Sequence, residues 1–225
     1  MSIILCKWIF LIKYETDNHS ERFKVRLIVR EFTQQFEVNY EDIFVLIIWF
    51  DFLKVLLALV IKFEWIIHMM NVQNVYLNSE LDKEIYMKVL KRMNHLFNQI
   101  CELLKSLYEL KQSMNLWNKK IIKTLKSLKF EQIFADVSVF IYSCDIIVTL
   151  YIDNMLILNN NLKKVKWVKN KIKKLHVMKN LSSISKILEI HVTHQTDDFI
   201  KINQNHYIQQ VLAEFDMKHA KQISV

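Results

Sequence analysis

The chain has 225 residues, of which 52% are apolar and 24% are charged, and its formal net charge is +8. This apolar share is enough for a folded core and excludes a wholly disordered tail. The sequence contains no glycine and no proline, although average usage would supply on the order of 16 and 11 of them. Because these two residues normally form tight turns, a process other than selection for a fold has altered this chain.

The N-terminal part of the chain predicts two strands followed by a helix. Apolar residues alternate with other residues over 7–15 and 23–30, which is typical of strands. Leucine and valine recur at helical spacing over residues 51–62. The apolar start of the chain is interrupted by lysines and lacks a small-residue cleavage site, so we expect a strand there and no signal peptide.

One apolar stretch, residues 43–61, is almost long enough to cross a bilayer. Asp51 and Lys54 lie near its middle, and each would cost roughly 2.5 to 3.5 kcal/mol there. We therefore expect no transmembrane helix and an intracellular location. A membrane-associated protein built around this stretch is the alternative.

The middle of the chain predicts a strand near residues 66–72 and a helix from about 115 to 128, whose inward face carries Trp117. A β-rich run, 146–151, is then interrupted by Asp153 and Asn154 before apolar character resumes. This pattern predicts a hairpin with a polar tip. A carboxylate at such a tip suits metal-dependent nucleotidyl transfer, although turns also contain Asp and Asn for purely structural reasons.

Seven lysines between Lys163 and Lys174 alternate with apolar residues at helical spacing. The pattern predicts an amphipathic helix, whose basic face is either merely solvated or binds phosphate. The three cysteines, Cys6, Cys101 and Cys144, have neither CxxC spacing nor close histidines, so we expect reduced thiols and no zinc site.

Several longer motifs follow one another along the chain. They are KVRLIVREF from Lys24, HMMNVQNVYLNSELDKEIYM from His68, SLYELKQS from Ser106, ADVSVFIY from Ala135 and YIDNMLI from Tyr151. In this order and spacing the sequence resembles the reverse transcriptase of copia-type retrotransposon polyproteins. The resemblance covers nearly the whole chain.

The resemblance implies an α+β fold with the right-hand polymerase architecture, in which an antiparallel sheet is backed by helices. Fingers would occupy residues 1–65, a palm with the catalytic strands residues 66–178, and the start of a thumb or connection residues 179–225. The implied partners are an RNA or DNA template-primer and deoxynucleotides, with no membrane partner. The oligomeric state is left open.

The resemblance also implies three aspartates that hold two Mg²⁺ ions for nucleotidyl transfer. The matching positions here are Asn71, Asp153 and Asn154, so Asp153 is the one catalytic and metal-binding carboxylate that survives. An amide offers a neutral oxygen and no charge, so a site designed around about −3 presents about −1. We therefore expect a catalytically inactive copy, with a non-catalytic nucleic-acid-binding remnant as the alternative.

Other implied roles concern the nucleotide. Tyr76 would exclude a ribose 2′-hydroxyl, Gln112 would pack on the incoming sugar, and Lys24 and Arg26 would face the triphosphate. The alternatives are a core aromatic ring for Tyr76 and a solvated strand face for the two cations.

Glycine positions of the family are occupied here by other residues. They are Glu31, Glu37, Glu64, Ser79, Glu109, Lys129, Asn159, Ser182 and Glu189. Further replacements include Val45 and Leu46, where the family commonly has alanine or proline. Single C-to-T or G-to-A transitions produce nearly all of these exchanges, so we expect an eroded element copy. A genomic comparison with equally frequent transversions would contradict this hypothesis.

Overall fold

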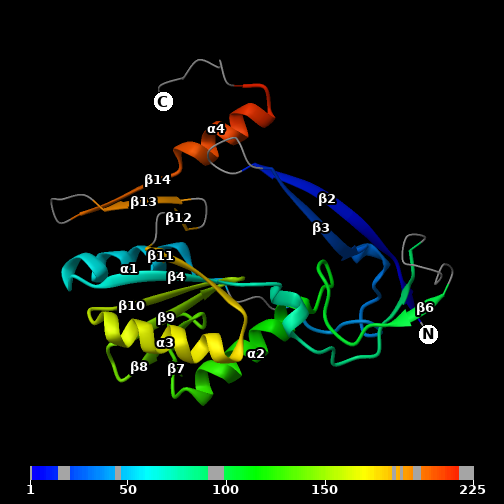
Figure 1. Ribbon diagram of the computed structural model, residues 1–225, viewed down its shortest axis with the longest axis horizontal. Coiled ribbons are helices and arrows are strands. Elements are labelled where there is room, and N and C mark those ends of the chain that lie inside the picture. Colours follow the sequence, from blue (N-terminus) through cyan, green and yellow to red (C-terminus); the bar gives the residue numbers. More distant parts are fainter. Residues whose placement is uncertain are drawn as a thin grey trace.

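A six-stranded antiparallel sheet forms the centre of the computed structural model, which describes residues 2–14, 21–43, 47–90, 99–183, 186–187, 190–194 and 199–217 (Figure 1). In spatial order its strands are β11 (Met178–Ser183), β4 (Ile66–Val72), β10 (Asn154–Asn159), β9 (Ile146–Tyr151), β8 (Val139–Tyr142) and β7 (Glu131–Gln132). Strands β4, β9 and β10 are the predicted strand and hairpin. The expected α+β class is confirmed, with four α-helices in the described part of the chain.

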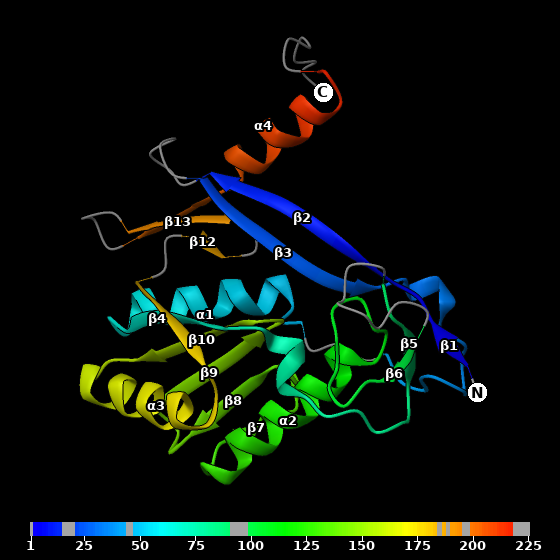
Figure 2. The same ribbon diagram turned by 45° about the vertical axis from the view of Figure 1, so that its right-hand side comes forward.

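Helices cover both faces of this sheet, as Figures 1 and 2 show. Helix α1 (Phe50–Lys62) packs on one face, where its leucines join Ile67, Leu156 and Leu158 in a buried cluster. Helices α2 (Ser113–Ser127) and α3 (Leu162–Leu175) pack on the other face. A strand with apolar residues on both faces needs such double cover, which is why β9 and β10 read as nearly continuous apolar runs.

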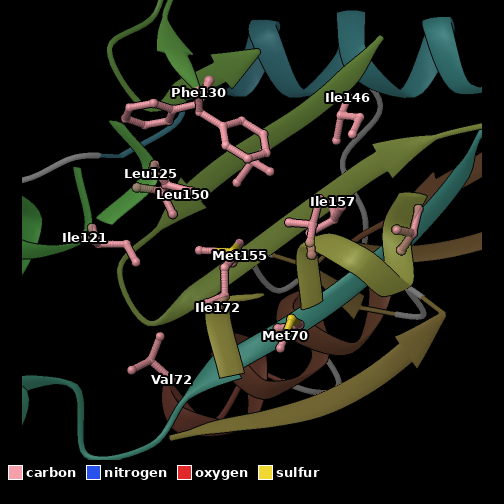
Figure 3. Close-up of a cluster of buried hydrophobic side chains, with 14 of the residues drawn as sticks. Met70, Val72, Ile121, Leu125, Phe130, Ile146, Leu150, Met155, Ile157 and Ile172 are labelled. Carbon is pink, nitrogen blue, oxygen red and sulfur yellow. The ribbon is translucent and has the colours of Figure 1, made fainter. Parts of the chain in front are cut away.

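The core between the sheet and α2 and α3 is shown in Figure 3. Ile121 and Leu125 of α2 and Ile172 of α3 are 0% exposed. They meet Met155 and Ile157 of β10, which are 1% and 0% exposed. This packing holds β10, which begins at Asn154, against α2 and α3.

Strands β2 (Cys6–Tyr14) and β3 (Glu21–Val29) pair along nine residues and form a long two-stranded ribbon. Beside its base lie β1 (Ile3–Ile4), β5 (Tyr86–Lys88) and β6 (Ile100–Glu102), which form a small sheet. The two predicted strands are confirmed. One face of the ribbon stays open, because Phe10 and Phe23 are 63% and 72% exposed.

The C-terminal part adds three short strands, β12 (Lys186–Ile187), β13 (Ile190–His194) and β14 (Ile200–Asn203), and helix α4 (Asn205–Glu214). Ile187, Ile190 and Val192 are buried with the α1 cluster. This small sheet therefore covers the side of α1 that faces away from the central sheet.

Four of the replaced glycine positions have left-handed backbone conformations. Glu37, Glu64, Glu109 and Lys129 have φ angles of 64°, 53°, 66° and 69°. Residues with a Cβ atom resist this region, whereas glycine enters it freely. At these four positions, where the resemblance implies glycine, the backbone has the conformation that favours glycine. Val45, Leu46 and Glu189 lie outside the described residues.

Helix α1 has 13 residues and begins at Phe50, so only part of the apolar stretch 43–61 is helical. Within the residues that the structure describes, no helix is long and apolar enough to cross a membrane.

Candidate functional site

The hairpin between β9 and β10 presents its tip at one end of the central sheet. Tyr151 pairs with Asn154, so the turn consists of Ile152 and Asp153, one residue earlier than the sequence predicts. Ile152 has a φ of 53°, as the first central residue of a type II′ turn requires. The indole Nε1 of Trp117 donates a hydrogen bond of 3.2 Å to the Ile152 carbonyl. Helix α2 therefore holds the turn, and with it Asp153, in place.

The structure brings together the three positions at which the resemblance implies metal-binding carboxylates. Asn71 of β4 lies opposite Asn154 of β10 in the antiparallel register. The Asn71 Nδ2 donates to Asn154 Oδ1 at 3.2 Å, and the Asn154 Nδ2 donates to Asp153 Oδ1 at 3.1 Å. The backbone nitrogen of Val72 also donates to the Asp153 carbonyl at 2.7 Å. The three side chains form one hydrogen-bonded row, which we call the Asn-Asn-Asp row.

The oxygen atoms of this row make it a poor site for a cation. Mg²⁺ prefers carboxylate oxygens, and the row has one carboxylate, an oxygen of which already accepts from an amide. One of the two amide oxygens is likewise engaged within the row. Among the described residues, no group of three or more His, Cys, Asp and Glu side chains could hold a metal ion. The residues present therefore do not fit a pair of Mg²⁺ ions.

Tyr76 lies next to this row, in the 3₁₀ turn η2 (Val75–Asn78). Burial, followed by the nearby carboxylates of Asp153 and Glu109, raises the pKa of its phenol above the usual value of 10. Its ring meets the Tyr108 ring edge-on, with 4.7 Å between the centroids. The Arg26 guanidinium lies 4.7 Å from the centroid of that same Tyr108 ring. Tyr108 thus connects two predicted site residues, a role that its place in the motif SLYEL did not indicate.

A cavity of about 180 Å³ opens beside Tyr76. Its lining includes two carboxylates, Glu31 and Glu109, and one cation, Lys111. The Lys111 ammonium lies 3.1 Å from a Glu31 oxygen, and this hydrogen bond is the main reason that the pKa of Lys111 is raised. Glu109 carries no ion pair within the described residues. Both carboxylates lie at positions where the resemblance implies glycine, and sequence reasoning had not placed Glu31 or Lys111 at the site.

Gln112 stays outside this cavity. Its side chain is 3% exposed and both ends of its amide are engaged, accepting from Gln34 at 3.0 Å and donating to the Asn39 carbonyl at 2.8 Å. It lines a separate pocket with Lys83 and Asn115. Its predicted contact with a sugar stays a prediction.

Lys24 lies on β3 two residues before Arg26, so the two side chains share one face of the ribbon. Both are partly exposed. The Nε atom of Arg26 is buried and has no hydrogen-bond partner in the described part of the molecule. The predicted contact of these two cations with a triphosphate also stays a prediction.

Comparison with known proteins gives a consistent result. A family model described as "Reverse transcriptase (RNA-dependent DNA polymerase)" matches residues 2–225. The Retrovirus-related Pol polyprotein from transposon TNT 1-94 of Nicotiana tabacum is 29% identical over 97% of this chain and 17% of its own length. The corresponding polyproteins from transposons RE1 and RE2 of Arabidopsis thaliana are each 24% identical over 100% of this chain and 16% of their own length. The chain therefore spans about a sixth of the length of these relatives.

Proposed function

The chain belongs to the reverse transcriptase (RNA-dependent DNA polymerase) family, and we propose that it is a retrotransposon polymerase segment that has lost nucleotidyl transfer. In this proposal residues 1–65 are the fingers, 66–178 the palm and 179–225 the start of a thumb, arranged as a right hand. The relatives' names and the antiparallel sheet between helices support this assignment. The Asn-Asn-Asp row is the observation that carries the loss of activity.

The row replaces mutual repulsion by mutual hydrogen bonding. Three adjacent carboxylates need cations between them, whereas Asn71, Asn154 and Asp153 satisfy one another without any. The row carries a charge of about −1, so the attraction for two divalent ions is largely lost. Without bound metal, no group in the row can lower the pKa of a primer hydroxyl or balance the charge of a leaving pyrophosphate.

The nucleotide side of the site supports the same proposal. Tyr76, Arg26 and Lys24 are retained, but Glu31 and Glu109 line the cavity beside Tyr76. Lys111 balances one of these carboxylates, which leaves Glu109 to repel a triphosphate. We propose that deoxynucleotide binding is weakened together with metal binding.

Primer extension tests this proposal. Wild-type chain and the Asn71→Asp/Asn154→Asp variant are given a DNA primer on an RNA template, deoxynucleotides and Mg²⁺ or Mn²⁺. The control, Asn160→Asp/Asn205→Asp, makes the same change of charge at exposed positions. We expect no primer extension by wild type or by the control. We expect extension by the Asn71→Asp/Asn154→Asp variant when it also carries Glu109→Gly. Extension by wild type would show that the row does not abolish activity.

Thermal unfolding supplies a readout that does not depend on activity. The restored variant gathers three carboxylates, so Mn²⁺ should raise its Tm in a concentration-dependent way. The Tm of wild type and of the control should stay constant. An equal Mn²⁺ response in all three proteins would contradict the proposed loss of the metal site.

Residual nucleic-acid binding without catalysis is a second candidate, favoured by the two partly exposed cations, Lys24 and Arg26, on one face of the ribbon. A salt titration of template-primer binding tests it. Replacement of Lys24 and Arg26 by glutamine should reduce the magnitude of the slope of log K against log salt by about 1.5, since each phosphate contact contributes about 0.7 to 0.9. An unchanged slope would remove this candidate.

A further inference from the structure

Helices α2 and α3 form a strongly basic layer on one face of the central sheet (Figure 2). Helix α2 has four lysines among 15 residues and α3 has seven among 14, and neither helix contains an aspartate or glutamate. The two helices are joined at His176, whose Nε2 lies 3.0 Å from Thr124 Oγ1 and whose ring meets the Trp117 ring at 5.3 Å. This contact holds α2 and the end of α3 together on the same face of the sheet.

Most of these lysines face solvent because the apolar sides of both helices are used in packing. In α3, Val165, Val168 and Ile172 are each 0% exposed and Lys169 is 6% exposed. The exposed lysines are Lys119, Lys120, Lys123 and Lys126 on α2 and Lys163, Lys164, Lys166, Lys171, Lys173 and Lys174 on α3. Within the described residues, two of them pair with a carboxylate: Lys119 with Asp42 at 3.9 Å and Lys164 with Asp145.

An exposed aromatic ring lies in the middle of the basic stripe of α3. Trp167 is 37% exposed and rests on the Tyr142 ring, with 5.4 Å between the centroids. Lys163 precedes it by four residues and Lys171 follows it by four, so both lie on the same face of the helix, one turn away on each side. Lys174, seven residues after Trp167, extends the stripe.

We propose that this outer face of α3, extended by the α2 lysines, binds single-stranded RNA through its phosphates and through a base stacked on Trp167. Lysines supply sequence-independent phosphate contacts, and an exposed indole supplies a stacking platform for an unpaired base. The surface shares no residue with the Asn-Asn-Asp row or with the cavity beside Tyr76. The inference goes beyond the proposed function, since RNA binding at this surface requires neither a bound metal ion nor a bound deoxynucleoside triphosphate.

The packing of α3 favours RNA over a lipid surface. A helix that lies in a membrane buries its apolar face among lipids, but that face of α3 is already buried against the sheet. Its 14 residues span about 21 Å, which matches the axial length of about six stacked nucleotides. Like charges also lie three residues apart on this face, in the pairs Lys163 with Lys166 and Lys171 with Lys174. A bound polyanion relieves the repulsion within each pair.

Binding of a short RNA strand to the 225-residue chain, without metal ions, tests the proposal. The probes are a single strand of about 12 nucleotides, twice the span of about six, and the duplex of the same length. The first variant, Lys163→Gln/Lys171→Gln/Lys174→Gln, is matched by Lys62→Gln/Lys88→Gln/Lys201→Gln, which removes the same charge at exposed sites elsewhere. The second, Trp167→Ala, is matched by Trp49→Ala, since Trp49 is 76% exposed.

For the single strand, we expect the α3 lysine variant to reduce the magnitude of the slope of log K against log salt by about 2. Its control should leave this slope unchanged. Trp167→Ala should weaken binding of the single strand about tenfold, leave duplex binding unchanged, and be rescued by Trp167→Phe. Circular dichroism at each step verifies that the variants keep their helices.

Three results of these measurements would overturn the proposal, and a fourth would move the contact to the ribbon. They are equal slopes for the two lysine variants, an equal effect of Trp167→Ala on single strand and duplex, and tighter binding to vesicles of anionic lipid than to RNA. Loss of RNA binding in Lys24→Gln/Arg26→Gln with full binding in the α3 variant would assign the contact to the ribbon instead. None of these outcomes depends on primer extension, so failure here is distinct from failure of the proposed function.

Discussion

Restoring glycine at two helix ends should stabilise this chain. Helices α1 and α2 both end in a Schellman motif, with Glu64 and Lys129 at the left-handed position. In α1 the Trp65 nitrogen donates to the Val60 carbonyl at 2.9 Å and the Glu64 nitrogen donates to Ile61 at 3.2 Å. The same pair of hydrogen bonds closes α2, where the Phe130 and Lys129 nitrogens each donate at 3.0 Å. The motif is therefore intact and only its residue is unsuited.

The expected gain follows from the backbone. A residue with a Cβ atom destabilises the folded state by about 1 to 2 kcal/mol when its backbone is left-handed. Glycine removes this cost, but it also gives the unfolded chain more conformational freedom, which offsets roughly half of the gain in stability. Lys129→Gly should therefore stabilise by at most about 0.5 to 1 kcal/mol, since it also removes a cation that is favourable at a helix C-terminus. Glu64→Gly should gain more, about 1 to 1.5 kcal/mol, because it also removes a carboxylate from a helix C-terminus.

The two sites lie in separate helices, so the double variant should gain about 2 kcal/mol and raise the Tm by about 4 to 8 °C. Urea unfolding followed by circular dichroism measures the change. Ala58→Gly is the matched control, since Ala58 is exposed inside α1, where glycine should destabilise by about 1 kcal/mol. Glycine at 64 and 129 that destabilised as much as glycine at 58 would refute the reasoning.

Three further predictions concern the same fold. Ile152→Gly should raise stability by about 0.5 to 1 kcal/mol in urea unfolding, because Ile152 holds a β-branched side chain at a φ of 53°. A loss of stability would show that the packing of its side chain matters more than its backbone strain. Phe140→Ala should destabilise by about 3 to 5 kcal/mol since Phe140 is 0% exposed, whereas Phe134→Ala, at a side chain that is 103% exposed, should change the unfolding midpoint little. Burial, and after it Lys120, lowers the pKa of His176 below its ordinary 6.5, so the unfolded state takes up the proton first. Stability should therefore hold above pH 6.5 and fall as the pH drops from 6.5 toward the lower folded-state pKa; His176→Gln should flatten that fall, and an unchanged pH profile would exclude the histidine as its cause.

Much of the fold could be predicted from local patterns. The spacing of apolar residues located α1, β4 and the β9–β10 hairpin to within a few residues, because helix and strand periodicities depend on neighbours along the chain. The turn at Ile152 and Asp153 was predicted one residue late, since only a left-handed Ile152 lets Asn154 begin the next strand. An isoleucine gives no signal for such a turn.

The burial of the ribbon was not predictable in the same way. Alternating apolar residues usually indicate a half-buried strand, and β2 and β3 do form. Nevertheless Phe10 and Phe23 remain exposed, because no described element packs on that face. Which face of a strand is covered depends on distant parts of the chain.

Local sequence patterns were enough to predict the ribbon strands, α1, α2, α3, β4 and the β9–β10 hairpin, together with the family resemblance and the amides at positions 71 and 154. Three features became visible in the folded chain alone: Asn71 meets Asn154 across two strands, Tyr108 bridges Arg26 and Tyr76, and Trp167 is exposed among lysines. The physical reason is that periodicity and residue chemistry act within a few residues. Strand register and helix packing, in contrast, join side chains that lie far apart along the chain, such as Asn71 and Asn154, which are separated by 83 residues.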